Sequence, residues 1–116
     1  MLNHDLVRIK HMVDGVGEIL RFTHGKKRND LDNNRLLSLA IVQLLEIIGE
    51  AANKVTPEFR AKYSQIPWKA IVEMRNRLIH GYYDIDLDIV WKTVVNEIPS
   101  LYKELEAVVR IEECAE

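Results

Sequence analysis

The sequence predicts an all-α protein, an up-and-down bundle of four main helices plus one short helix. Apolar residues recur every three or four positions along most of the chain, which is the spacing of one face of an α-helix. Glycine occurs five times and proline three times in 116 residues, so few turns interrupt these helices. No segment alternates strictly between polar and apolar residues as a half-buried strand does. Residues 1–116 are long enough for one core and are expected to form a single helical domain.

The first helix is expected to run to about residue 23 and to stop at Gly25, because glycine readily adopts the left-handed conformation that follows many helices. A loop is expected at 25–29. Asp30 or Asp32 can then cap the second helix. The apolar stripe of the first helix comprises Leu2, Leu6, Ile9, Met12 or Val13, Val16, and Ile19 or Leu20.

The second helix, about 31–55, is the most apolar segment of the chain. A helix that is apolar on two faces is either central in its bundle or shared with a second subunit. Because only four substantial helices are available, a homodimer interface is the better explanation. One stripe consists of Leu37, Ile41, Leu44, Ile48, Ala51 or Ala52, and Val55, and more apolar surface comes from Leu36, Leu39, Val42, Leu45 and Ile47. Close helix approach at the interface would be permitted by Gly49, Ala51 and Ala52.

A short helix is expected next, because Thr56 can cap it and Pro57 suits its first position. It should end near Tyr63. After a break in the chain, Pro67 begins the third main helix, which ends at His80 before a glycine. The residues of this helix that are expected to face inward are Trp68, Ile71, Met74 or Val72, Leu78 and Ile79.

The last helix is expected to span about 87–112, with the charged turn at 84–86 as its cap. Pro99 removes one backbone hydrogen bond within this helix, so a kink is predicted near Val95. The apolar stripe consists of Leu87, Val90 or Trp91, Val94, Ile98, Leu101, Leu105 and Val108.

The charge of the chain is nearly balanced overall but uneven along its length. A net charge of -2 argues against a protein that coats nucleic acid by charge alone, and no binding to DNA is expected. Residues 1–28 hold six Lys and Arg against three Asp and Glu, whereas residues 84–116 hold three against nine. Any surface that binds anions must therefore be local. Arg75 and Arg77 are the candidates, together with the basic run 26–28, for which an ordinary solvated loop is the favoured interpretation.

Composition also indicates the compartment. Cys114 is the single cysteine, so the chain forms no internal disulfide and no cysteine-based zinc site. Asp5 and Arg8 lie where a signal peptide would need an apolar run. No segment is expected to reach the roughly 18 apolar residues of a membrane span. We therefore expect a cytoplasmic protein that does not associate with membranes.

One stretch combines two arginines, an amide, an imidazole and a phenol at a predicted helix end: Arg75, Asn76, Arg77, Leu78, Ile79, His80, Gly81 and Tyr82. On a regular helix Asn76 and His80 lie about 40° apart around the axis and share a face, and Arg77 lies about 60° from His80. Arg75 lies about 140° from His80. Either the helix unwinds before His80, or a second chain brings its own copy across a two-fold axis.

Such a set of side chains suits cleavage of an RNA phosphodiester. An imidazole exchanges protons near neutral pH, as attack by a ribose 2′-hydroxyl requires. A guanidinium binds phosphate and stabilises charge in the transition state, and this chemistry needs no metal. A purely structural role is also open: His80 would be a helix C-terminal residue favoured by the helix dipole, and Arg75 would pair with Glu46 or Glu50.

The pattern Arg-Asn-x-x-x-His-x-Tyr at the end of a helix resembles the HEPN superfamily. More narrowly, it resembles the HepT ribonuclease toxins that are encoded beside a minimal nucleotidyltransferase antitoxin. The segments 49–52 (Gly-Glu-Ala-Ala), 66–68 (Ile-Pro-Trp) and 84–86 (Asp-Ile-Asp) are also similar to that family. The similarity covers nearly the whole chain, so a single HEPN-like domain is expected.

The resemblance implies a role for each motif residue. Arg75 and His80 match the catalytic residues, Asn76 matches their usual polar neighbour, and Tyr82 matches the tyrosine that the antitoxin modifies with AMP. Proteins of this kind are metal-independent endoribonucleases that leave a 2′,3′-cyclic phosphate, with the site at a homodimer cleft. An adenylate on Tyr82 would add negative charge and bulk near the phosphate site and so inhibit cleavage. Tyr83 is either an alternative acceptor or, as we favour, a packing residue.

The expected partners are therefore RNA, a second copy of the chain and a nucleotidyltransferase antitoxin, and no cofactor is expected. Arg77 is expected to contact RNA. Two other hypotheses remain open. The chain could be a non-catalytic helical module that binds nucleotide or a nucleotidyltransferase partner, or a purely structural dimerisation bundle.

Overall fold

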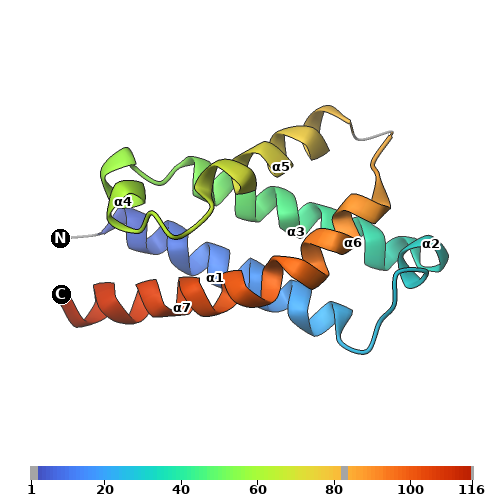
Figure 1. The fold of residues 1–116 in the computed structure, drawn as a ribbon, viewed down its shortest axis with the longest axis horizontal. Coiled ribbons are helices and arrows are strands. Elements are labelled where there is room, and N and C mark those ends of the chain that lie inside the picture. The colour runs from blue at the N-terminus through green and yellow to red at the C-terminus, as the bar shows by residue number, and fades with distance from the viewer. Residues whose placement is uncertain (1–2, 82–83, 116) are drawn as a thin grey trace.

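The structure is a computed structural model that describes residues 3–81 and 84–115. Within these ranges every regular element is a helix and there is no strand (Figure 1). The helices are α1 (His4–Thr23), α2 (Asp30–Asn33), α3 (Arg35–Asn53), α4 (Pro57–Lys62), α5 (Trp68–His80), α6 (Leu87–Asn96) and α7 (Ile98–Ala115). The prediction of an all-α protein is confirmed.

The long helices run alternately up and down the molecule (Figure 1). α1 packs against both α3 and α7, and α5 packs against the other side of α3. α6 leads into α7, and these two helices together form the fourth rod of the bundle. Of the short helices, α4 was expected and α2 was not. The start of α1 and the end of α7 lie at the same end of the molecule (Figure 1).

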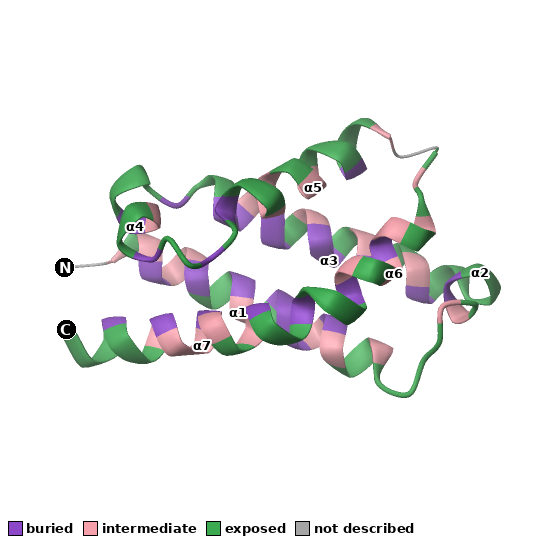
Figure 2. Cartoon of the chain, in the orientation of Figure 1, coloured by how far each residue is buried: buried purple, intermediate pink, exposed green. Residues whose placement is uncertain are grey.

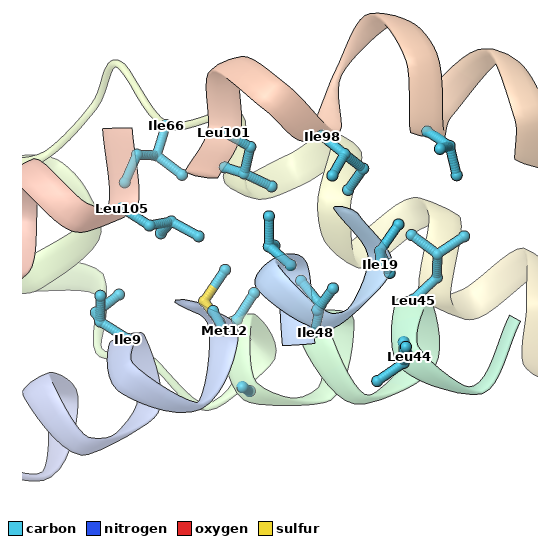
Figure 3. Packing of buried hydrophobic residues seen from close by; sticks show 14 of the residues in the cluster. Ile9, Met12, Ile19, Leu44, Leu45, Ile48, Ile66, Ile98, Leu101 and Leu105 are labelled. Atoms are coloured by element: carbon cyan, nitrogen blue, oxygen red, sulfur yellow. The ribbon is translucent and has the colours of Figure 1, made fainter. Parts of the chain in front are cut away.

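A single cluster of buried apolar side chains fills the space between the helices. Ile9, Met12 and Ile19 of α1 are fully buried, as their spacing predicts. Figure 3 shows them in the same core cluster as Ile48 of α3, with Ile9 on the side of Leu105 of α7. In Figure 2 the buried residues of α1, α3 and α7 form stripes along these helices. Burying a side chain of this size stabilises a fold by roughly 1.5–3 kcal/mol, so the packing of α1 against α3 and α7 contributes substantially to stability.

Side chains cap most of the helix starts. Thr56 Oγ1 accepts a hydrogen bond from the Phe59 N–H at 3.3 Å, so the predicted cap of α4 is confirmed. The prediction that Asp30 or Asp32 caps the second long helix is wrong. Residues 30–33 form the separate helix α2, and the Asn34 side chain caps α3 by accepting from the Leu37 N–H at 3.0 Å. Asn34 has extended dihedral angles, which suit a capping residue and separate the two helices.

The predicted last helix is two helices that meet at Glu97. Pro99 has no N–H, and its ring would clash with the carbonyl of Val95 in a continuous helix. The Glu97 N–H still bonds to the Thr93 carbonyl at 2.9 Å, and the Leu101 N–H bonds to the Glu97 carbonyl at 3.0 Å. The prediction of one helix with a kink near Val95 is therefore wrong: proline causes a break, two residues later.

Helix α3 has the two apolar faces that its sequence predicts. Its predicted stripe is buried, and Leu45 is buried with it. The second face lies at the surface of the single chain, where Leu36 is 80% exposed, Leu39 is 51% exposed and Ile47 is 43% exposed. The prediction that the small residues of α3 serve a dimer interface is wrong, because Gly49, Ala51 and Ala52 are all buried within one chain.

By length and composition alone, α3 is apolar enough to cross a membrane, with a mean hydropathy of 1.5. It is not, however, a run of about 18 apolar residues, because it contains Arg35, Glu46 and Glu50. Its buried face nevertheless packs between α1 and α5 in the compact bundle. The core helix of a globular protein can have these properties, and burial accounts for one of the two apolar faces of α3.

The last turns of α7 are fastened to α4 by a buried carboxylate. Lys62 Nζ donates to Glu112 Oε2 at 2.7 Å, and the Tyr63 hydroxyl donates to the same oxygen. Glu112 is only 7% exposed. The Lys62 ammonium and the Tyr63 hydroxyl together lower the pKa of the Glu112 carboxyl below its ordinary value. The Trp68 indole N–H donates to the Tyr63 carbonyl at 3.0 Å, which also ties this cluster to the start of α5.

Substituting Glu112 should therefore change how stability depends on pH. Because the pKa is lower in the folded chain than in the unfolded chain, the stabilisation is present above the unfolded pKa and is lost as the pH falls through the folded value. Glu112→Gln is expected to lower the free energy of unfolding by about 1 kcal/mol at pH 7. This is the additional strength that a hydrogen bond gains when its acceptor is charged. As the pH falls below about 4.3, the ordinary pKa of a glutamate, the variant should lose less stability than the wild type in urea denaturation. If the stability of the two proteins changes with pH in the same way, Glu112 does not have this role.

Candidate active site

Helix α5 carries the candidate residues and is held mainly by one neighbour, α3. Only Trp68 and Leu78 of α5 are buried. Ile79 is 40% exposed, so the prediction that it faces inward is wrong. A helix that packs on a single neighbour buries a narrower stripe than the sequence suggested. Most of the polar side chains near the end of α5 are consequently at the surface (Figure 2).

Gly49 allows α3 and α5 to approach closely at the candidate site. A Cβ atom at position 49 would lie 2.2 Å from the Cβ and 2.8 Å from the Cγ of Arg75. It would also lie 3.2 Å from the carbonyl oxygen of Ile71. The first of these distances is far below van der Waals contact, so only glycine fits here without moving a helix. The aliphatic stem of Arg75 therefore lies directly against the α3 backbone.

The guanidinium of Arg75 is held at both terminal nitrogens. Its Nη2 donates to Glu50 Oε2, and its Nη1 donates to Asn76 Oδ1 at 2.9 Å. The other carboxylate oxygen of Glu50 lies 3.7 Å from the Lys54 ammonium. Arg75 Nε is buried and has no hydrogen-bond partner among the described residues. The side chain of Arg75 is 23% exposed, so it is only partly covered by its neighbours.

The helix stays regular up to His80. Residues 68–80 are helical throughout, and the Gly81 N–H then bonds to the Arg77 carbonyl at 2.9 Å. The first of the two alternatives, unwinding before His80, is therefore not observed. Arg75 and His80 remain about 140° apart around α5. Within the described ranges no hydrogen bond or ion pair joins them, whereas Arg75 and Asn76 are bonded to each other.

Arg77 lies beside a hollow between α5 and the start of α6. The hollow has a volume of about 200 Å³ and is also lined by Gly81, Asp84 and Asp86. Arg77 and His80 are the basic residues of the last turn of α5, where the helix dipole favours positive charge. Positive side chains at this end can attract the phosphate groups of a nucleic acid, and such contacts do not depend on base sequence.

Tyr82 and Tyr83 lie outside the described residues, so the expected modification site has no structural description. The chain is described again from Asp84, whose N–H bonds to the Gly81 carbonyl at 2.9 Å. The Asp86 side chain caps α6 as the sequence predicts, accepting from the Asp88 N–H at 2.9 Å.

The basic run 26–28 is partly occupied by contacts outside this site. In the basic run 26–28, Arg28 Nε donates to Asp88 at 2.6 Å and Nη1 donates to Asp32 at 3.0 Å. Arg28 therefore joins α2 to α6, and only Lys26 and Lys27 remain exposed as candidates for anion binding. Among the described residues there is no group of three or more His, Cys, Asp and Glu side chains placed to hold a metal ion.

The geometry combines features of both hypotheses for the motif. Arg75 pairs with Glu50, as a structural role predicts, and His80 is exposed at the C-terminus of α5. The sequence suggested Glu46 or Glu50 as equivalent partners for Arg75, and only the packing of α5 on α3 distinguishes them. The sequence associated Gly49 with a dimer interface, whereas its actual contact is with the stem of Arg75 in the same chain.

The chain is similar to a known protein family over most of its length. Residues 12–108 match the family described as HepT-like, Ribonuclease HepT-like. "Putative RNase MJ1380" of Methanocaldococcus jannaschii is 37% identical over 97 residues, which cover 84% of this chain and 89% of the relative. "Putative RNase TTE0752" of Caldanaerobacter subterraneus subsp. tengcongensis is 36% identical over 104 residues, which cover 90% and 93%. "Probable ribonuclease HepT" of Thermococcus cleftensis is 33% identical, with 80% and 84% covered. No solved structure matches the chain significantly.

Proposed function

Because the chain belongs to the HepT-like ribonuclease family, we propose that it is a metal-independent endoribonuclease and the toxin of a toxin–antitoxin pair. The observation that carries this proposal is that the family match, residues 12–108, includes the whole motif from Arg75 to His80. The motif lies at the solvent-exposed end of α5, where a large polymer can reach it. Residues 1–116 would then be one HEPN-like domain, acting in the cytoplasm.

Each motif residue has a role in the proposed reaction. The ribose 2′-hydroxyl loses its proton and attacks the adjacent phosphorus, the bond from phosphorus to the 5′-oxygen breaks, and that oxygen gains a proton. His80 transfers one of these protons, since an imidazole can donate or accept near neutral pH. Arg75 stabilises charge on the phosphate, Asn76 orients Arg75, and Arg77 binds a neighbouring phosphate. The products are a 2′,3′-cyclic phosphate and a free 5′-hydroxyl.

The proposed active site is shared between two protomers. Because α5 stays helical to His80, Arg75 and His80 of one chain point about 140° apart. Two copies related by a two-fold axis could supply Arg75 from one protomer and His80 from its partner. The exposed apolar residues of α3 and Ile79 of α5 offer the surface for such an interface.

The direct test is RNA cleavage by the purified wild-type protein in EDTA. We expect cleavage to persist in the chelator and the fragments to carry 2′,3′-cyclic phosphates, detected by mass spectrometry of the products. A strict requirement for Mg²⁺ would contradict the metal-independent mechanism. Absence of cleavage with every RNA tested would favour the alternative, a non-catalytic module. The observation that favours this alternative is the pairing of Arg75 with Glu50, which gives the arginine a structural role.

The dimer is tested separately by a charge on the exposed face of α3. Leu39 is 51% exposed in the single chain, so Leu39→Glu should leave the monomer fold intact. Buried in an interface, the carboxylate would lack a partner and oppose association strongly. We expect the wild type to sediment as a dimer and the variant as a monomer without RNase activity. A variant that stays dimeric would place the interface elsewhere.

Regulation by the antitoxin is tested by modification of Tyr82. Coexpression with a minimal nucleotidyltransferase and ATP should add adenylate to Tyr82, and the modified protein should not cleave RNA, because the adduct brings negative charge to the phosphate site. Intact-mass and peptide mass spectrometry would locate the adduct. Tyr82→Phe should remain active and unmodified, whereas Tyr83→Phe should still be modified. An adduct on Tyr83 alone would reverse this assignment.

A further inference from the structure

We propose that Glu50 is a positioning residue for Arg75, fixing its guanidinium in the orientation that binds the reacting phosphate. This inference rests on the proposed RNase activity and assigns a role to a residue outside the Arg-to-His motif. A flexible arginine loses side-chain entropy when it binds a ligand, and prior immobilisation reduces that loss. The contacts of Arg75 immobilise it in three places: at its stem and at both terminal nitrogens.

The stem of Arg75 is confined by the α3 backbone. The Cβ and Cγ of Arg75 occupy the space where a side chain at position 49 would begin. Since Gly49 and Glu50 are consecutive, the same turn of α3 both confines the stem and supplies the carboxylate. The orientation of the guanidinium is therefore linked to the packing of α5 on α3, not to the arginine alone.

The bonds to Arg75 leave donors for a substrate. A guanidinium has five N–H groups, two on each terminal nitrogen and one on Nε. Glu50 takes one from Nη2 and Asn76 takes one from Nη1. One N–H on each terminal nitrogen therefore remains for phosphate oxygens. Planar donors fixed in this way provide the preorganised stabilisation that a developing negative charge requires.

Glu50 does not cancel the local positive charge. Its Oε1 lies 3.7 Å from the Lys54 ammonium while Oε2 accepts from Arg75. One carboxylate between two cations leaves a net charge of about +1 on this group of three side chains. The site consequently still attracts an anionic phosphate, and the carboxylate acts on the direction of the guanidinium more than on the charge of the site.

The test compares steady-state cleavage of a fluorogenic RNA by wild type, Glu50→Ala and Glu50→Gln in EDTA. We expect Glu50→Ala to lower kcat by about tenfold to a hundredfold, because a misplaced catalytic group costs this much. KM should change by less than about threefold, since Arg77 and the other positive side chains, which the substitution leaves in place, still bind RNA. Glu50→Gln should restore a measurable part of kcat, because its carbonyl oxygen can still accept from Nη2. Glu46→Ala, one turn earlier on α3, should behave as wild type.

The other outcomes would overturn the assignment. Equal kcat for Glu50→Ala and wild type would show that Arg75 needs no such support. A lower KM with unchanged kcat would show that Glu50 competes with phosphate. Circular dichroism could show that Glu50→Ala does not fold. The folded variant Glu50→Gln then provides the test, and a kcat equal to that of the wild type would count against the proposal. An inactive wild type would instead overturn the proposed RNase function itself, and with it this role.

Discussion

Replacing His80 with alanine is expected to lower the rate of RNA cleavage by about 10²–10⁴-fold, the usual contribution of a general acid or base. His80 is exposed at the end of α5, so the substitution removes no core contact and the variant should fold normally. Single-turnover cleavage in EDTA, with circular dichroism to confirm folding, measures this effect. Mixing this variant with Arg75→Ala, followed by subunit exchange, should restore part of the activity if the site combines Arg75 and His80 from different protomers.

His11→Ala is the matched control, because His11 is also exposed and lies on α1, outside the motif. Its cleavage rate should equal that of the wild type. A folded His80→Ala protein that cleaves at the wild-type rate would remove His80 from the mechanism. Failure of the mixture to regain activity, with each variant dimeric, would instead favour a site formed within one chain.

Gly49→Ala is expected to destabilise the protein by about 1–2 kcal/mol and to impair RNA cleavage at the same time. Alanine would gain up to about 1 kcal/mol of helix propensity over glycine, but its Cβ would lie 2.2 Å from the Cβ of Arg75. Relief of this contact requires α3 and α5 to separate, and overpacking of this kind costs about 1–3 kcal/mol and sometimes more. Movement of Arg75 by about 1 Å would reduce the cleavage rate by up to about a hundredfold. Urea denaturation and the cleavage assay measure the two effects.

Gly17→Ala provides the comparison. Gly17 is also within a helix, but a Cβ there would meet the ring edge of Tyr102 at 3.3 Å and the end of Arg21 at 3.4 Å. These are ends of side chains that can shift by a few tenths of an ångström, so the change in stability should be within about 1 kcal/mol of zero. If Gly49→Ala and Gly17→Ala are equally stable, α5 can move away from α3 without a loss of stability.

The helices were predictable from the sequence because local signals determine their existence. The spacing of Ile9, Met12 and Ile19 predicts the buried face of α1, and Thr56 caps α4 as its side chain suggests. The one cap that was predicted wrongly, that of α3, has several candidate residues in succession. Asn34 competes with the aspartates before it, and only the extended backbone at Asn34 separates α2 from α3.

The role of Gly49 was not predictable from local sequence. Small residues on an apolar helix permit close packing against any partner, and periodicity cannot say whether that partner is another helix or another subunit. Arg75, an arginine on a half-buried helix, gave no indication that its stem would fill the space opposite a glycine. The pattern of the motif predicted the candidate residues, whereas the packing of α5 on α3 determines that Arg75 contacts Glu50 and Asn76.

The positions of the chain ends have a practical consequence for these experiments. The start of α1 and the end of α7 lie together at one end of a molecule whose longest dimension is 46 Å, and α5 ends toward the other (Figure 1). A tag, a fluorophore or a fused reporter attached through either end of the bundle would therefore lie away from His80. Labelled protein should cleave RNA and form dimers as the unlabelled chain does, which makes subunit exchange between two labelled variants measurable by energy transfer.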